Sequence, residues 1–176
     1  MKNFLHWISG YMPFREISDG DTPYLERYYI ATLFGWRFYL HRFVGSDPDR
    51  GLHDHPWSRA FSVILSGWYY EVTRSGERKV RWFNSLTGDT FHRVVLPVST
   101  WRTQGGGGKF DRPDPCWTLF MHKAGCVKPW GFWREHEQRL VDIGFDKGGA
   151  TFQPYTYARE GSQKDWWLTA KRRGQK

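Results

Sequence analysis

Short runs of aromatic and β-branched residues, separated by turn-forming residues, recur along most of this chain. Between residues 27 and 135 these runs follow one another at intervals of roughly 8–12 residues, the spacing typical of a β-sandwich or barrel. Aromatic and β-branched side chains favour strands, whereas the intervening Gly, Asp, Ser and Pro favour turns. No segment in this region predicts a long helix. The sequence therefore predicts an all-β fold.

Length and composition favour one domain with a bulky core. The chain has 176 residues, and 19% of them are Phe, Trp or Tyr, which bury large areas in strands. We expect an irregular N-terminal lead-in (1–26), a barrel (27–135) and an irregular C-terminal extension (136–176). The extension is expected to pack on the barrel and to end in a basic tail.

Charge and targeting signals restrict the expected partners and location. The formal net charge of +8 favours an anionic partner such as a phosphorylated small molecule, a nucleic acid or an acidic surface. The basic residues are scattered and no nucleic-acid-binding motif is present, so nucleic acid is the weaker interpretation. The sequence shows no signal peptide and no long uncharged apolar stretch, which predicts a cytoplasmic protein with no membrane span. A homodimer stays open.

Two histidines, His53 and His55, stand two residues apart just before an apolar run. In an extended strand side chains alternate between faces, so both imidazoles are expected on one face. Two neutral imidazoles on one face can bind a single divalent cation. Pro56 follows directly and favours a strand end or bulge. The alternative is a pair of surface histidines on an edge strand.

A third histidine, His92 in the run GDTFHRV, extends the pattern, and at this point the chain resembles the cupin superfamily. The first motif of that family contains HxH and, in its longer form, a glycine twelve residues further on; here His53, His55 and Gly67 match. His92 is the match for the histidine of the second motif. The resemblance implies a double-stranded β-helix (jelly-roll) barrel that binds one metal ion through these three histidines.

A narrower resemblance covers about residues 25–135. The runs at 39–43, 47–57 (DPDRGLHDHPW), 117–120 and 130–132 look like a family of uncharacterised bacterial and phage cupin proteins. This likeness implies a fold and a metal, but it hardly implies a reaction.

The first motif departs from the family pattern, because Ala60 stands where the family has a glutamate. Glu71 offers a substitute carboxylate. If Ser66-Gly67 forms a two-residue hairpin turn, Ser62 pairs with Glu71 and the two share a face. Glu71 would then be a metal ligand or a catalytic base beside the metal. A longer turn would place Glu71 on the solvent face instead.

Further residues are candidates for the substrate pocket. His41, Trp57 and Trp68 are expected to line it, with core packing as the alternative. Arginines can bind an anionic substrate bidentately, although each is also a candidate surface residue. The candidates are Arg59, which we also consider as a catalytic residue, Arg93 and Arg102.

Three neutral imidazoles leave a divalent ion with open coordination positions, so the sequence favours a metal-dependent enzyme acting on a small, anionic molecule. With Fe(II), the first choice, the resemblance implies dioxygenase-like chemistry. With Zn, Mn or Ni the same set of ligands would suit Lewis-acid isomerisation or hydrolysis. The alternatives are a metal-free or non-catalytic barrel that binds a sugar or nucleotide sugar, and a phage-associated accessory protein.

Overall fold

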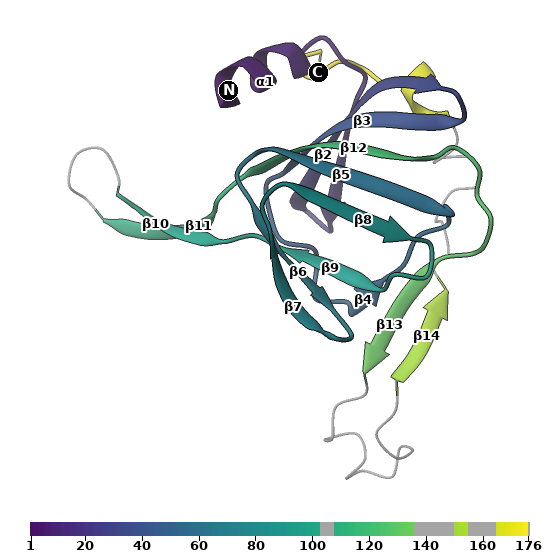
Figure 1. Cartoon of the computed structure of the whole chain (residues 1–176). Helices are drawn as coiled ribbons and strands as arrows, with labels where there is room; N and C mark the ends of the chain where they lie inside the picture. The colour runs from purple at the N-terminus through teal and green to yellow at the C-terminus, as the bar shows by residue number, and fades with distance from the viewer. Residues whose placement is uncertain (103–107, 136–149, 155–164, 176) are drawn as a thin grey trace.

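The computed structural model describes residues 1–102, 108–135, 150–154 and 165–175. These residues form an all-β fold with one short α-helix (Figure 1), as the sequence predicts. The N-terminal elements are α1 (Lys2–Ser9), β1 (Phe14–Asp19), β2 (Thr22–Leu33), β3 (Trp36–Phe43) and β4 (Leu52–His53). The central strands are β5 (Arg59–Ser66), β6 (Tyr69–Thr73), β7 (Gly76–Val80), β8 (Phe83–Thr87) and β9 (His92–Val95). The remaining elements are β10 (Val98–Arg102), β11 (Lys109–Pro113), β12 (Cys116–Lys123), β13 (Gly131–Glu135), β14 (Ala150–Pro154) and the 3₁₀-helix η1 (Trp166–Leu168).

Two six-stranded antiparallel sheets make up the body of the protein. The first sheet has the order β1-β2-β3-β12-β5-β8, and the second has the order β14-β13-β4-β9-β6-β7. Four of the pairs are β3 with β12, β4 with β9, β5 with β8 and β6 with β7. Early strands thus pair with late ones in nested order, which is the topology of a jelly roll. Strands β10 and β11 form a separate two-stranded arm that projects from the body (Figure 1).

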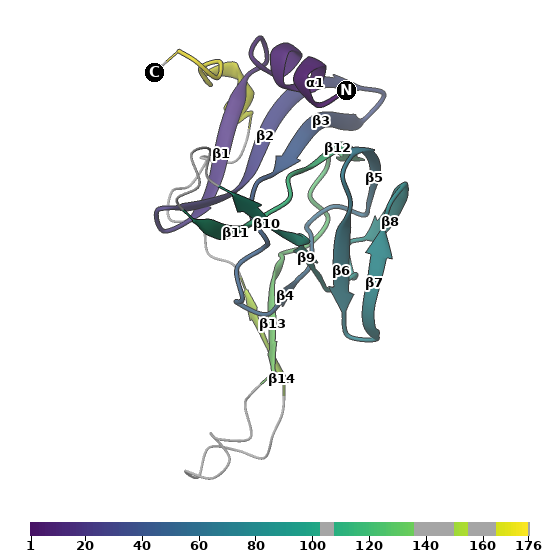
Figure 2. The same ribbon diagram turned by 90° about the vertical axis from the view of Figure 1, so that its left-hand side faces the viewer.

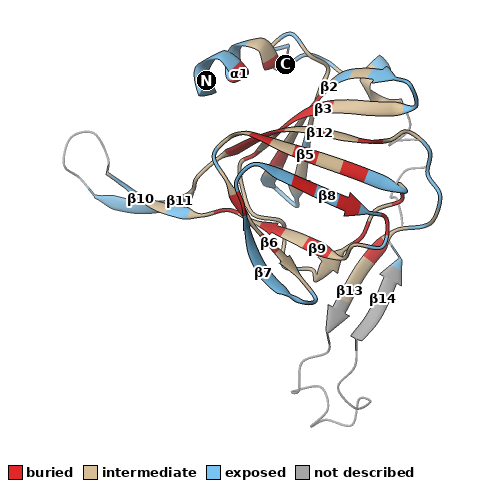
Figure 3. Cartoon of the chain, in the orientation of Figure 1, coloured by how far each residue is buried: buried red, intermediate tan, exposed pale blue. Residues whose placement is uncertain are grey.

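Alternation along the strands decides which side chains enter the space between the sheets. Strand β5 buries every second residue from Ala60 to Ile64, and β12 does the same from Thr118 to His122. Figure 3 shows that buried residues concentrate in the two sheets, whereas the arm and β7 are largely exposed. The largest core cluster has members from both sheets: Leu25, Phe43, Ile64, Tyr69, Val80, Val94, Leu96 and Cys116.

The N-terminal lead-in is more regular than the sequence predicts. Strands β1 and β2 belong to the first sheet and lie beside β3 (Figure 2), so the sheet begins well before Arg27. Leu5 of α1 packs with Tyr28, Leu40 and Trp117, which closes the outer face of this sheet. No helix among the described residues is both long and apolar enough to span a bilayer.

Much of the predicted C-terminal extension, 136–149 and 155–164, lies outside the described residues. Its described part packs on the barrel: the ring of Trp167 stacks on Tyr29 with a centroid distance of 4.4 Å. Trp166 packs against the cluster that contains Tyr39 and Phe120.

The predicted hairpin between β5 and β6 is wrong, because these strands lie in different sheets. Gly67, with a φ of +85°, lies where the chain crosses from one sheet to the other. Ser62 pairs with Asn84 of β8, whereas Glu71 pairs with Val94 of β9. Both Ser62 and Glu71 are nevertheless buried, because each occupies the inward face of its own sheet.

Candidate metal centre

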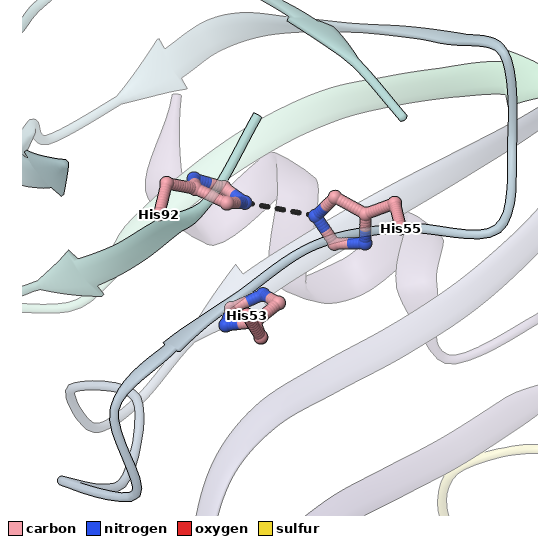
Figure 4. Close-up of side chains that lie close together, drawn as sticks. All are labelled: His53, His55 and His92. Carbon is pink, nitrogen blue, oxygen red and sulfur yellow. Dashed lines mark hydrogen bonds between the residues drawn. The ribbon is translucent and has the colours of Figure 1, made fainter. Parts of the chain in front are cut away.

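Three histidines converge on the inner face of the second sheet (Figure 4). His53 of β4 pairs directly with His92 of β9, and directly paired residues share a face. His55 lies two residues after His53, and its ring centroid is 5.0 Å from each of the other two. The Nε2 atoms of His55 and His92 are 2.8 Å apart, and the ligand atoms of all three residues lie within 4.8 Å of one another.

Glu71 contacts the His92 ring at Nδ1, the nitrogen that points away from His55. Its Oε1 lies 3.0 Å from His92 Nδ1, and the carboxylate also contacts Asn84 Nδ2 at 2.6 Å and Arg78 Nη2 at 2.5 Å. Burial raises the pKa of Glu71, but the hydrogen bonds from His92 and Asn84 and the charge of Arg78 lower this pKa by more. An ionised Glu71 accepts the Nδ1–H of His92, which leaves the Nε2 lone pair directed at His55.

The other two histidines are held in the neutral form. Burial lowers the pKa of His53 and of His55 well below the usual value, and neighbouring histidines lower both further. At neutral pH these imidazoles therefore offer lone pairs and no charge. A cation that replaces the hydrogen bond between His55 Nε2 and His92 Nε2 would be bound by these two nitrogens and by His53, and a set of three imidazole ligands suits a divalent transition metal. The residues present thus fit the predicted ion.

The missing glutamate of the family motif is not replaced at the same place. Ala60 lies on the first sheet, buried and in contact with Leu86 and Phe120. Glu71 contacts the His92 nitrogen that points away from His55, so its position suits orientation of a ligand.

Asp54 faces away from the two neighbouring histidines, as alternation predicts. Its buried carboxylate accepts a hydrogen bond from the backbone N–H of Gly131 at 2.7 Å and one from Lys128 Nζ at 2.7 Å. Asp54 thereby attaches the segment before β13 to the strand end that carries the histidines.

A cavity of about 490 Å³ lies between the two sheets and includes all three histidines in its wall. Its other walls are largely aromatic. Trp57 stacks on His55 with a centroid distance of 4.4 Å and on His122 at 4.2 Å. The further aromatic lining residues are Tyr24, Tyr39, Phe43, Tyr69, Phe120, Trp130, Phe132 and Trp166.

The structure places some of the predicted pocket residues in this cavity and others outside it. His41 and Trp57 line it. Arg59 does not, because it precedes the inward Ala60 and is exposed. Arg93 follows His92 and so faces the other way, where it pairs with Asp49.

Two more predicted residues stand apart from the cavity. Trp68 packs with Tyr70 at 4.8 Å and with Lys79 Nζ at 3.4 Å, and it is not part of the cavity wall. The side chain of Arg102 lies outside the described part of the structure.

Several cavity residues were not predicted from the sequence, above all Arg27, Arg37 and His122. Arg37 lies two residues before Tyr39 and four before His41 on β3, so side-chain alternation alone predicts that it shares their face. Arg27 is different, because it reaches the cavity through the pairing of β2 with β3, in which it stands opposite His41.

No protein-family profile and no curated protein sequence matches this chain. Solved structures with a similar fold include a cupin-2 domain protein from Shewanella frigidimarina, with 11% identity, coverage of 54% of this chain and 76% of that one, and a TM-score of 0.40. A cupin-like protein from Thermotoga maritima has 12% identity, coverage of 61% and 74%, and a TM-score of 0.42. The Fe(II) form of HppE has 10% identity, coverage of 64% and 56%, and a TM-score of 0.45. The likeness concerns the fold alone.

Proposed function

We propose that this jelly roll is a metal-dependent enzyme of the cupin type, in which His53, His55 and His92 bind one divalent ion. The observation that carries the proposal is the convergence of three imidazoles, with ligand atoms within 4.8 Å of one another, in the wall of a cavity. Its size supports a small-molecule substrate, because pockets for such ligands measure about 300–1,000 Å³.

Each residue around the cluster has a task in this proposal. Glu71 fixes the tautomer of His92 and the direction of its Nε2, in the manner of a carboxylate that orients a metal-binding histidine. Trp57 holds the His55 ring by stacking at an interplanar angle of 14°. The aromatic lining keeps bulk water from the substrate and strengthens electrostatic interactions inside the cavity.

A bound divalent ion would supply Lewis acidity and open coordination positions for substrate, water or dioxygen. We propose Fe(II) as the first choice, with Zn, Mn and Ni as alternatives that the same donor set accommodates. Iron would direct the activity towards oxidation, whereas the other ions would direct it towards isomerisation or hydrolysis.

Elemental analysis of protein purified without added metal tests the proposal. We expect close to one equivalent of a divalent transition metal in the wild type, and its loss in His53→Ala, His55→Ala and His92→Ala. His6→Ala is the matched control, because His6 is exposed on α1, and it should keep the metal. Full metal occupancy in all three cluster variants, or a metal-free wild type that binds none on addition, would overturn the proposal.

A further inference from the structure

The cavity has a second chemically distinctive wall, formed by the first sheet. Arg37, Tyr39 and His41 alternate along β3 and all three line the cavity. Arg27 of the neighbouring strand β2 also lines it and stands opposite His41. Two guanidinium groups thus share one cavity with the histidine cluster, which the facing sheet contributes.

The hydrogen bonding of Arg37 leaves part of its guanidinium without a partner among the described residues. Its Nε is buried and makes no hydrogen bond. The ion pair with Asp165 has a long N···O distance of 3.6 Å, and the guanidinium stacks over the Trp167 ring at 4.9 Å. A buried cationic donor without a hydrogen bond is costly, and an anionic ligand is the partner that best offsets this cost.

Arg27 is held in the cavity wall by His41. Its Nε donates a hydrogen bond to His41 Nε2 at 3.0 Å, and its guanidinium lies 5.4 Å from the centre of the Tyr39 ring. Burial lowers the pKa of His41 well below its usual value, and the charge of Arg27 lowers it further. His41 is therefore a neutral acceptor that orients Arg27 and adds no charge of its own.

The charges of Arg27 and Arg37 act on the same part of the cavity. Burial lowers the pKa of His122 to about 3, and both arginines contribute to this shift. Burial raises the pKa of Tyr39, and the same two arginines oppose that rise. The charges of both guanidinium groups thus act on Tyr39 and His122, which line the cavity.

The cavity lining contains more arginines than carboxylates. The described lining residues include four arginines, Arg15, Arg27, Arg37 and Arg50, and two carboxylates, Glu16 and Asp47. One of the arginines, Arg50, pairs with Asp19 at 2.6 Å, and the lining histidines His41, His53, His55 and His122 have lowered pKa values. Guanidinium groups that line a cavity can bind an oxyanion through charge-assisted hydrogen bonds.

We propose that Arg27 and Arg37 form an anion subsite, which binds a phosphate or carboxylate group of the substrate across the cavity from the histidine cluster. The substrate is thus a small organic anion with its reacting end at the histidines. This assignment rests on the proposed function for that reacting end. Binding of the anionic group itself depends on the arginines alone.

Calorimetric titration with inorganic phosphate, and separately with acetate, tests the subsite in chelator-treated protein, where no ion can bind either probe. We expect saturable binding by the wild type and a loss of about tenfold or more in affinity in Arg37→Gln and Arg27→Gln, since each removes a charge-assisted hydrogen bond. Arg59→Gln is the matched control, because Arg59 is an exposed arginine on the same sheet, and it should bind like the wild type. Tighter binding of phosphate than of acetate identifies a phosphorylated substrate, and the reverse identifies a carboxylic acid.

The proposal is overturned if the wild type binds neither probe, if Arg37→Gln binds as tightly as the wild type, or if Arg59→Gln weakens binding equally. Arg27→Lys is measured beside Arg27→Gln, because it keeps the positive charge and serves as the test at this position if Arg27→Gln fails to fold. If neither Arg27 variant folds, the affinity of Arg37→Gln decides the outcome. The outcome is independent of the metal test. Arginine-dependent phosphate binding in a protein that takes up no metal would keep the subsite and reject the proposed enzyme, whereas metal uptake with unchanged binding in Arg37→Gln would do the opposite.

Discussion

His92 Nδ1 lies 3.0 Å from Oε1 of Glu71, a buried carboxylate on the neighbouring strand β6. Glu71 pairs directly with Val94, and directly paired residues lie on the same face of the sheet. His92 lies two residues before Val94, so it lies on that face too and its ring can contact Glu71. This contact selects the tautomer of His92 whose Nε2 faces the other histidines.

Replacing this carboxylate should weaken metal binding. Because a carboxylate behind a ligating histidine commonly contributes 10–100-fold to metal affinity, we expect Glu71→Gln to raise the dissociation constant for zinc by about that factor. Competition with a chromophoric chelator measures it, and circular dichroism checks the fold. Glu77→Gln, at an exposed position on β7, is the control. An affinity in Glu71→Gln equal to that of the wild type would contradict the role assigned to Glu71.

Acid should destabilise the protein through His122. Burial lowers the folded-state pKa of this residue to about 3, whereas an unfolded histidine titrates near 6.5. Between these values the unfolded chain binds one more proton, so the free energy of unfolding falls as the pH decreases from 6.5 towards 3, by about 1.4 kcal/mol per pH unit. Urea titrations of chelator-treated protein from pH 7 to pH 4 should show a shallower decline in His122→Asn. An unchanged slope would mean that His122 is protonated in the folded state.

Removing the Asp54 carboxylate should destabilise the segment before β13. Asp54→Ala leaves the buried Gly131 N–H without its acceptor and leaves Lys128 paired only with Asp89, so the free energy of unfolding should fall by about 2–4 kcal/mol. Asp89→Ala removes the other carboxylate that Lys128 contacts, but its side chain is 88% exposed. We expect this control to change stability by less than about 1 kcal/mol. Equal effects of the two substitutions would argue against an anchoring role for Asp54.

The crossing between the sheets should require glycine at position 67. A Cβ there would lie 2.8 Å from the carbonyl oxygen of Pro115, and the φ of +85° is already unfavourable for other residues. We expect Gly67→Ala to lower the free energy of unfolding by about 2–4 kcal/mol. Gly35→Ala isolates the backbone contribution, because Gly35 has a φ of +73° and a Cβ added there would meet no atom within 4 Å, so about 1 kcal/mol is expected. Chemical denaturation measures both, and a loss in Gly67→Ala no larger than in Gly35→Ala would refute the close approach.

Local periodicity predicted much of the site. The same-face geometry of His53 and His55, and the opposite orientation of Asp54, follow from the period of two in an extended chain. The assignment of His92 rested on a resemblance, and the structure brings it beside the other two. The prediction that Glu71 faces the interior was based on a hairpin that does not exist, because Ser62 and Glu71 are each buried on a different sheet.

The predicted arginines illustrate the limit of local reasoning. Arg59 and Arg93 lie close to the histidines in sequence, yet each directly precedes or follows an inward residue and so faces outwards. Arg27 and Arg37 lie far from the motif along the chain and enter the cavity through the pairing of β2 with β3 and the closure of the two sheets.

The sequence by itself determined that this chain forms short strands and which residues along each strand share a face, because side-chain alternation is a property of the local backbone. Tertiary structure alone decided which strands became neighbours, that Glu71 lies behind His92, and that Arg27 and Arg37 face the histidines. Strand pairing depends on how whole faces pack between the sheets, and that free energy belongs to residues far apart in the chain.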